Sequence, residues 1–262
     1  MNFEYVGLTD PGLLRENNED SVAVEPLQGV AVLADGMGGY NAGEIASAMA
    51  VTFVKAELSR WLSEATPQRT AGDIKHAIEV CVVNANQSIY NAANANPQFS
   101  GMGTTIVVGV FNAGRVLLAH VGDSRCYVWR NSSLLQLTKD HSLLQEQLEA
   151  GLLTPEQAKV ASHKNLVTRA LGVEEGVSVD IVEHVPELGD IYLMCSDGLS
   201  DMVDDEDLGR VLSSKMTLQE RADALIRAAN EAGGRDNISV ILIGTKAESG
   251  AQSFFSRILR RA

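Results

Sequence analysis

The sequence is poor in cysteine, in basic residues and in long apolar runs. Its 262 residues include three cysteines, Cys81, Cys126 and Cys195, which lie far apart and form no C-x-x-C pair. This excludes a disulfide framework and a cysteine metal clip, so we expect three reduced thiols in the core. No stretch approaches the roughly 20 apolar residues that a membrane-spanning helix needs.

Positive charge is also scarce. The 21 lysines and arginines stand against 34 acidic residues, a net charge of −13. Phosphate neutralisation needs clustered Lys and Arg, so we expect no nucleic-acid partner. The first residues, MNFEYVGLTD, lack the basic start and apolar centre of a secretory signal peptide, and we therefore expect a cytoplasmic protein.

Several common catalytic motifs are missing as well. No cysteine is followed six positions later by an arginine, and the chain has no G-x-S-x-G, H-E-x-x-H or G-x-x-x-x-G-K-[ST] pattern. These absences remove the main covalent and nucleotide-binding alternatives. What the chain does have is 45% hydrophobic residues, which at this length is enough for a sizeable core.

Apolar periodicity divides the chain into separate blocks of strands and helices. Steps of three and four predict two successive long helices, one over about 20 residues from Ala42 and one starting at Asp73 as N-cap. Alternating runs predict strands on both sides of this pair, including one at Val177–Val182, and residues 141–172 form an insertion. Because the blocks do not alternate, we predict a single α+β domain rather than a doubly wound sheet.

Aspartates recur where the predicted strands meet turns of small residues. Asp35, Asp123 and Asp197 follow apolar runs, Asp236 precedes the last strand, and Asp20 lies near the N-terminus. Turn chemistry explains any single one of them. Together they predict a cluster, because strands of one sheet place their like-handed ends at the same rim. Such a cluster repels itself unless cations neutralise it.

Oxygen ligands without suitably spaced histidines or cysteines favour hard cations, so we predict Mg²⁺ or Mn²⁺. Two such ions about 3.5–4 Å apart can share a bridging hydroxide and neutralise charge on a phosphoryl group. Hydrolysis of phosphate esters is therefore the predicted chemistry.

Seven short motifs, taken together and in this order, indicate a protein family. They are RENNED (15–20), DGMGG (35–39), GTT (103–105), VGDSR (121–125), DHS (140–142), SDG (196–198) and GGRDN (233–237). In these motifs, and over about residues 3–244, the chain resembles the bacterial form of the PPM-type (type 2C) metal-dependent serine/threonine protein phosphatases. The resemblance implies a four-layer α-β-β-α sandwich of two antiparallel sheets flanked by helix pairs, with metals at one end.

The resemblance also implies metal ligands. Asp35 would bridge two tightly bound ions, the Gly36 carbonyl would bind one of them, and Asp197 and Asp236 would complete the other. Asp20 would act mostly through metal-bound water.

A third, weaker ion and a phosphate contact are implied in the same way. Asp123, together with Asp197, matches the position of the weaker ion. Arg15 matches the arginine that grips the substrate phosphate, a role that suits a planar guanidinium. The alternative for Arg15 is a surface arginine paired with Glu16 or Glu19.

The chain departs from many eukaryotic members at Met37, where they have a histidine proposed as general acid. A thioether cannot donate a proton, so the leaving-group acid stays unassigned, although bacterial members commonly have methionine there. His163, in a stretch that resembles the family's mobile flap, is a weak candidate for substrate contact. For His163 and His141 we favour a structural role. Three polar residues are expected to support the site by hydrogen bonds: Thr104, Thr105 and Asn237.

The leading hypothesis is a phosphatase that removes phosphate from serine and threonine side chains of proteins by direct attack of a hydroxide bridging two metal ions. Phosphorylated proteins would be its substrates and a serine/threonine kinase its counterpart. One alternative is a regulatory phosphatase dedicated to a single signalling protein. Another is a catalytically inactive relative that only binds partners, which the retention of Asp35, Asp197 and Asp236 argues against.

We expect the phosphatase domain to span residues 1–245, with the flap-like insertion at about 141–172, and a short tail to follow at 246–262. The tail places three arginines beside Phe254, Phe255, Ile258 and Leu259. We favour a tail that packs on its own domain or frays, with weak contact to a membrane surface or to a partner as the alternative.

Overall fold

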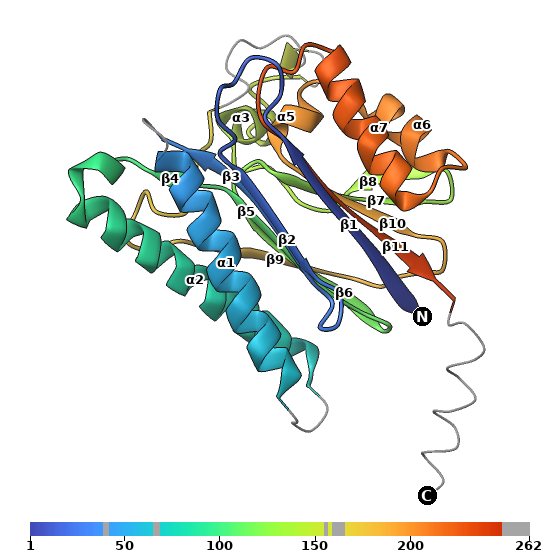
Figure 1. Ribbon diagram of the computed structural model, residues 1–262, viewed down its shortest axis with the longest axis horizontal. Coiled ribbons are helices and arrows are strands. Elements are labelled where there is room, and N and C mark those ends of the chain that lie inside the picture. The colour runs from blue at the N-terminus through green and yellow to red at the C-terminus, as the bar shows by residue number, and fades with distance from the viewer. Residues whose placement is uncertain (39–41, 65–68, 155–156, 159–165, 248–262) are drawn as a thin grey trace, which may run out of the picture.

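Two antiparallel β-sheets packed face to face form the centre of the molecule in a computed structural model, which describes residues 1–38, 42–64, 69–154, 157–158 and 166–247 (Figure 1). The elements, in chain order, are β1 (Asn2–Asp10), β2 (Asp20–Glu25), β3 (Val30–Met37), α1 (Ala42–Ser63), α2 (Ala71–Ala95), the 3₁₀ helix η1 (Pro97–Phe99), β4 (Gly103–Thr104), β5 (Ile106–Asn112), β6 (Arg115–Val121), β7 (Arg125–Arg130), β8 (Ser133–Gln136), α3 (Leu143–Glu149), β9 (Asp180–His184), β10 (Ile191–Cys195), α5 (Asp197–Ser200), α6 (Asp205–Ser213), α7 (Leu218–Glu231) and β11 (Ile238–Lys246).

The strand order explains how distant parts of the chain meet. Sheet A has the order β1-β11-β10-β7-β8, and sheet B has the order β2-β3-β5-β6-β9, with β4 paired to β3. The N-terminal and the last described strands are neighbours in sheet A, where Asn2 lies opposite Lys246 and Asp10 opposite Ile238. Loops from both halves of the chain therefore reach the same end of the sandwich.

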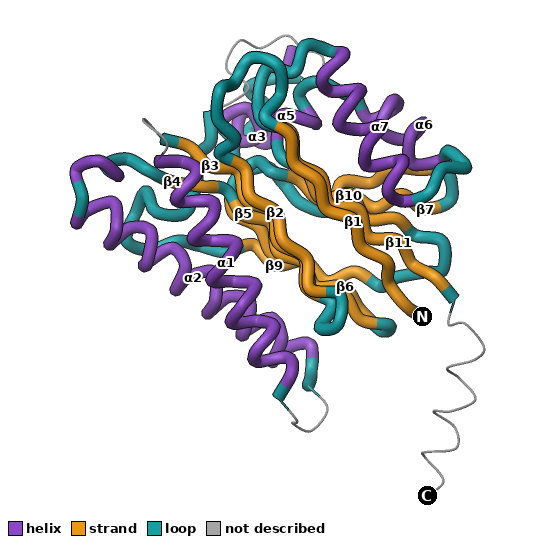
Figure 2. The backbone as a smooth tube through the Cα atoms, viewed as in Figure 1, coloured by secondary structure: helices purple, strands orange, loops and turns teal. Residues whose placement is uncertain are grey.

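Helix pairs cover the two outer faces, which gives four layers (Figure 2). Alternation along β3 shows the division: Val30 and Val32 pack under α1 and α2, whereas Ala31 and Leu33 face the other sheet. On the opposite side, α6 and α7 pack on sheet A through residues such as Leu225. The predicted α-β-β-α sandwich is confirmed.

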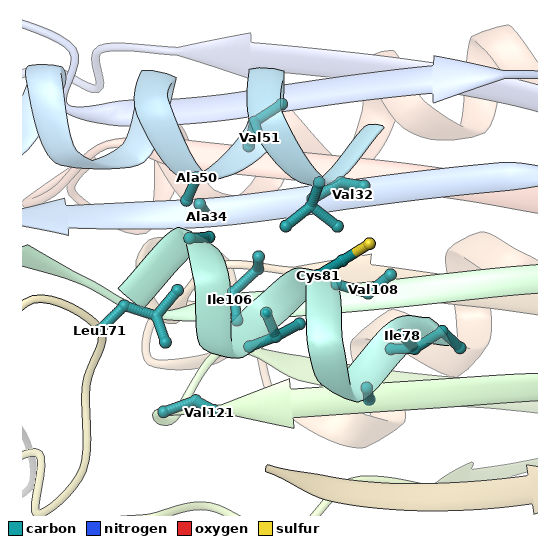
Figure 3. Packing of buried hydrophobic residues seen from close by; sticks show 14 of the residues in the cluster. Val32, Ala34, Ala50, Val51, Ile78, Cys81, Ile106, Val108, Val121 and Leu171 are labelled. Carbon is teal, nitrogen blue, oxygen red and sulfur yellow. The ribbon is translucent and has the colours of Figure 1, made fainter. Parts of the chain in front are cut away.

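The layer under α1 and α2 is filled by small and branched side chains (Figure 3). Ala50 and Val51 of α1 and Ile78 and Cys81 of α2 point onto the sheet. Small residues such as Ala50 let the helices lie close to the strands. Burial of the whole face stabilises the sheet, and the sheet in turn fixes the positions of the strand ends.

Two local predictions from the sequence are wrong. The strand expected at Val177–Val182 is β9, which begins at Asp180 because its partner β6 ends at Val121 and Asp180 pairs with His120. The N-cap of α2 is Thr70 rather than Asp73. The two form a reciprocal capping box, in which the Asp73 carboxylate accepts from Thr70 N at 2.7 Å.

The insertion at 141–172 is described in part. Its described residues include α3, and its two ends lie side by side, since Leu143 N donates to Leu166 O and Thr168 N donates to His141 O, both at 2.9 Å. His163 and the tail segment 248–262 lie outside the described residues. The domain boundary at residue 245 stays a prediction. Among the described helices none has the length and apolarity to cross a membrane.

We predict that Leu58→Ala lowers the free energy of unfolding by about 2–5 kcal/mol. Leu58 lies on the buried face of α1, is fully buried, and its truncation leaves a cavity. Leu27→Ala, at a leucine that is 90% exposed, should change it by less than about 0.5 kcal/mol. Urea unfolding of both variants measures the difference. Equal losses would show that the layer under the helix pair does not stabilise the fold as described.

Candidate active site

Five aspartates meet at one end of the sandwich, the end where α3 and α5 lie in Figure 1. Asp20 begins β2 and lies opposite Asp35 of β3, while the others flank strands: Asp123 follows β6, Asp197 follows β10 and Asp236 precedes β11. Burial raises the pKa of Asp35 well above its ordinary value, and the negative charges of the other four carboxylates raise it further. The predicted cluster is therefore present as a group of interacting charges.

The backbone of Asp35 is fixed by two threonines from the neighbouring strand region. Thr104 Oγ1 and Thr105 N donate to the Asp35 carbonyl at 2.8 and 2.9 Å, and Asp35 N donates to Thr105 Oγ1 at 3.1 Å. The next residue, Gly36, packs so closely on Gly43 that a Cβ atom would overlap the Gly43 carbonyl oxygen. A larger residue would push the start of α1 away from the site.

Asp20 joins the two sheets. Its Oδ2 accepts from Ser196 Oγ at 2.8 Å, and the same Oγ accepts from Ser239 N at 2.9 Å, so one hydroxyl links β2 with the ends of β10 and β11. Asp20 Oδ1 is buried without a hydrogen-bond partner among the described residues. Burial is the main reason that the pKa of Asp20 rises to about 6. A buried acceptor without a donor suits a cation or one of its waters.

Asn237 holds the N-terminal loop against the start of β11. Its Nδ2 donates to the carbonyls of Pro11 and Asn17 at 3.0 and 2.9 Å, and its Oδ1 accepts from Glu19 N at 2.8 Å. All three bonds cross between segments more than 200 positions apart, and Figure 1 shows the two loops side by side. The role expected for Asn237, support by hydrogen bonds, agrees with these contacts.

Arg15 lies on this loop and points to the cluster. Its Nη2 donates to Asp236 Oδ2 at 2.8 Å, and its side chain is 53% exposed. The salt bridge of Arg15 is thus with a predicted metal ligand, and its positive charge also acts on the carboxylate of Glu19. An exposed guanidinium beside the carboxylates can also reach an anionic ligand.

Asp123 and Asp197 occupy the other side of the cluster. Gly122 places Asp123 in a turn at φ +108°, and burial, with a smaller contribution from Asp140, raises the pKa of Asp123 to about 6. Burial raises the pKa of Asp197 well above its ordinary value, and repulsion from Asp123 and Asp201 contributes to the same increase. The sequence patterns did not single out Asp201, although its spacing of four from Asp197 is that of neighbours on one helical turn.

The residues present fit divalent cations. Every potential metal ligand in the cluster is an oxygen, and Asp20 Oδ1 is buried without a hydrogen-bond donor among the described residues. Burial first and repulsion from neighbouring carboxylates second raise the pKa values of Asp35 and Asp197, so ionising them together is unfavourable. Cations would satisfy the unpaired oxygen and would neutralise the repulsion between the carboxylates. Hard ions such as Mg²⁺ and Mn²⁺ match a set of ligands that are all oxygens.

A second group of possible ligands, His120, His141 and Asp180, has its ligand atoms within 4.8 Å of one another. Here Arg169 already supplies a cation, because its Nη1 donates to Asp180 Oδ1 at 2.8 Å. His141 Nδ1 accepts from Gly122 N at 3.0 Å, and its Nε2 lies 3.0 Å from Arg169 Nη1, so both ring nitrogens already have partners. This arrangement favours the structural role that we expected for His141, as a brace for the turn before Asp123.

The fold and these contacts can now be set beside known proteins. A family model for protein phosphatase 2C matches residues 15–242. The chain belongs to the protein phosphatase 2C family. It is a serine/threonine protein phosphatase of this family, whose members depend on metal ions.

Similar proteins cover nearly the whole chain. The serine/threonine phosphatase stp of Listeria innocua is 41% identical over 238 residues, 90% of this chain and 93% of that protein. The solved structure of the Streptococcus agalactiae serine/threonine phosphatase has a TM-score of 0.85 at 37% identity, covering 93% of this chain and all of the other. The catalytic domain of PstP, solved with two manganese ions, has a TM-score of 0.81 at 36% identity, covering 92% and 97%.

We predict that Asp123→Asn stabilises the metal-free phosphatase near neutral pH. A carboxyl whose pKa is raised in the folded state adds stability below its ordinary pKa of 3.8, and this stability is lost as pH rises through about 6. The amide avoids this loss, so the gain should be of the order of 2 kcal/mol at about pH 8 and close to zero at about pH 4.

Urea unfolding in EDTA at both pH values measures this effect. Glu79→Gln, at an exposed position on α2, is the control and should show no such pH-dependent gain. A destabilised Asp123→Asn protein at about pH 8 would contradict the assignment of Asp123 to a repelling cluster.

Proposed function

We propose that this phosphatase hydrolyses phosphoserine and phosphothreonine in proteins with two tightly held Mn²⁺ or Mg²⁺ ions, and that a third, weaker ion binds beside them. The observation that carries the proposal is the group of five buried or half-buried aspartates around Asp35, whose own pKa is raised by burial and then by the charges of the other four. The two manganese ions in the PstP structure support the same number here.

Each residue has a distinct role in this proposal. Asp35 would bind both ions. The Gly36 carbonyl would be a further ligand of one ion, and Asp197 and Asp236 would be further ligands of the other. When bound, two such ions supply a water-derived nucleophile at neutral pH and neutralise phosphoryl charge. Asp20 would act mostly through metal-bound water, and its Oδ1, which has no hydrogen-bond partner among the described residues, supports this role.

Asp123 and Arg15 act beside the tightly held ions. Asp123 would join Asp197 at the weaker ion. Arg15 would bind the phosphate and orient it, and its pairing with Asp236 sets the guanidinium at the edge of the cluster before substrate arrives. Two parallel donors to two phosphate oxygens would fix the direction of the scissile bond.

The cellular setting is also a proposal. We infer a cytoplasmic enzyme that opposes a serine/threonine kinase, because the similar proteins are named serine/threonine phosphatases. A role dedicated to one signalling protein is the alternative. An inactive, purely binding protein is disfavoured, since the complete carboxylate set would then be retained at a cost in stability.

We predict that hydrolysis of p-nitrophenyl phosphate and of a phosphothreonine peptide requires added Mn²⁺ or Mg²⁺. EDTA should abolish both activities while the circular dichroism spectrum is kept. Asp236→Ala should lower kcat by several orders of magnitude, because a metal ligand is lost. Glu79→Gln serves as the matched control and should behave as wild type. Full turnover of metal-stripped enzyme would refute the proposal.

We predict that Arg15→Ala lowers kcat/KM for the phosphothreonine peptide by an amount equivalent to about 2–3 kcal/mol, mainly through a higher KM. The bond to phosphate exists in the ground state as well as in the transition state, which is why KM carries most of the effect. Arg15→Lys should recover only part of the loss, because an ammonium cannot donate two parallel bonds.

Steady-state kinetics decides the role of Arg15. Arg227→Ala, at an exposed arginine on α7, is the control for the loss of one positive charge. Unchanged kcat/KM in Arg15→Ala would leave Arg15 as a surface partner of Asp236 alone.

A further inference from the structure

A groove of about 340 Å³ opens beside the loop that carries the predicted metal ligands. Its walls come from three segments: Met37 at the end of β3, residues 167–170 and residues 173–178. Met37 lies two positions after Asp35 on β3, so one wall of the groove belongs to the strand that carries a predicted metal ligand. The volume is at the small end for ligand pockets and fits a side chain better than a large cofactor.

The apolar wall of the groove depends on Gly103. A Cβ atom at Gly103 would lie 3.0 Å from Met37 Cε and 3.0 Å from Val173 Cγ2, so the two side chains flank this glycine closely. Because position 103 has no side chain, both can lie against the same point of β4. Val173 nevertheless remains 56% exposed, which leaves its apolar surface open toward the groove.

A buried side-chain amide on α2 holds the loop that carries Val173 in place. Asn86 of α2 is fully buried; its Oδ1 accepts from Gly172 N at 2.8 Å, and its Nδ2 donates to Glu174 O and Glu175 O at 3.1 and 3.0 Å. Three bonds to backbone groups on both sides of Val173 fix its position. The wall is therefore formed before any ligand binds, which lowers the entropic cost of binding.

Arg169 and Glu174 are the charged residues among those that line the groove. Arg169 is engaged by Asp180 Oδ1 at 2.8 Å and by the Ser178 carbonyl at 3.2 Å, so its charge is already balanced. Glu174 is exposed at the rim. Ala170 and Val177 add further apolar surface beside Met37 and Val173.

We propose that this groove is a specificity subsite that receives an apolar side chain of the phosphoprotein, close in sequence to the phosphorylated serine or threonine. The inference rests on the proposed function, since it requires the phosphate to lie at the carboxylate cluster. It also gives Met37 a role, because the thioether supplies apolar surface to the substrate chain. Burial of one apolar side chain in such a subsite is worth about tenfold in kcat/KM.

The test uses phosphothreonine peptides with alanine at the three positions on either side of the phosphothreonine. Leucine, lysine or aspartate then replaces each alanine in turn, and kcat/KM is measured with Mn²⁺ present. Wild-type enzyme should prefer leucine over alanine by about tenfold at one position. Val173→Asp should abolish this preference, and Val173→Ala should reduce it.

The control is Val185→Asp, which replaces a valine that is 66% exposed just after β9, at the end of sheet B away from the carboxylates. It should keep the leucine preference. Urea unfolding confirms that the Val173 variants are folded.

Three results would overturn the inference: no leucine preference in the wild type, a preference kept in Val173→Asp, or a lysine preference in place of leucine, which would make Glu174 the recognition group. Metal-dependent hydrolysis of p-nitrophenyl phosphate, which has no flanking residues, tests the proposed function separately. Its presence beside any of these results would reject the subsite alone, whereas its absence would reject the proposed function.

Discussion

Repulsion among buried carboxylates is the constraint on which the rest of the molecule depends. Asp35 is buried beside four other aspartates, so burial and then the negative charges of these neighbours raise its pKa well above its ordinary value. A fold that relied on these groups for its own stability would separate or neutralise them. Here the sheets and their two helix pairs supply the stability, and the strand ends are free to hold charges together until cations balance them.

Short polar side chains, rather than the carboxylates themselves, keep this arrangement in register. Ser196 links Asp20 to the backbone of Ser239, and Asn237 ties the loop of Arg15 to β11. Thr105 fixes the backbone of Asp35. Each of these groups is hydrogen-bonded and uncharged, so each holds part of the cluster in place without adding to the electrostatic repulsion. Preorganisation of this kind lets metal binding proceed without large rearrangement of the backbone.

The sequence predicted the features that rest on repeated patterns, and it missed those that rest on single tertiary contacts. Periodicity was sufficient for the helices and strands of a single α+β domain, the family resemblance implied the four layers, and strand ends were sufficient for the aspartate cluster. The start of β9 at Asp180 depends on where its partner β6 ends, which no local pattern records. Thr70 was overlooked as a cap because Asp73 is an equally good cap residue taken alone. The role of Ser196 depends on three strands meeting, which is visible only in the folded chain.

Asn86 shows how recognition and stability share one helix. The apolar face of α2 packs on sheet B, yet one position of this buried face is an amide whose three hydrogen bonds all go to the loop at 172–175. An apolar residue there would leave the backbone groups of that loop without partners, so the amide is retained for the loop and not for the core. Because the same loop presents Val173 beside Met37, the packing of α2 on the sheet sets the shape of the surface on that side of β3. Chemistry and substrate choice can then vary separately, since one depends on charges at strand ends and the other on a wall positioned by the helix layer.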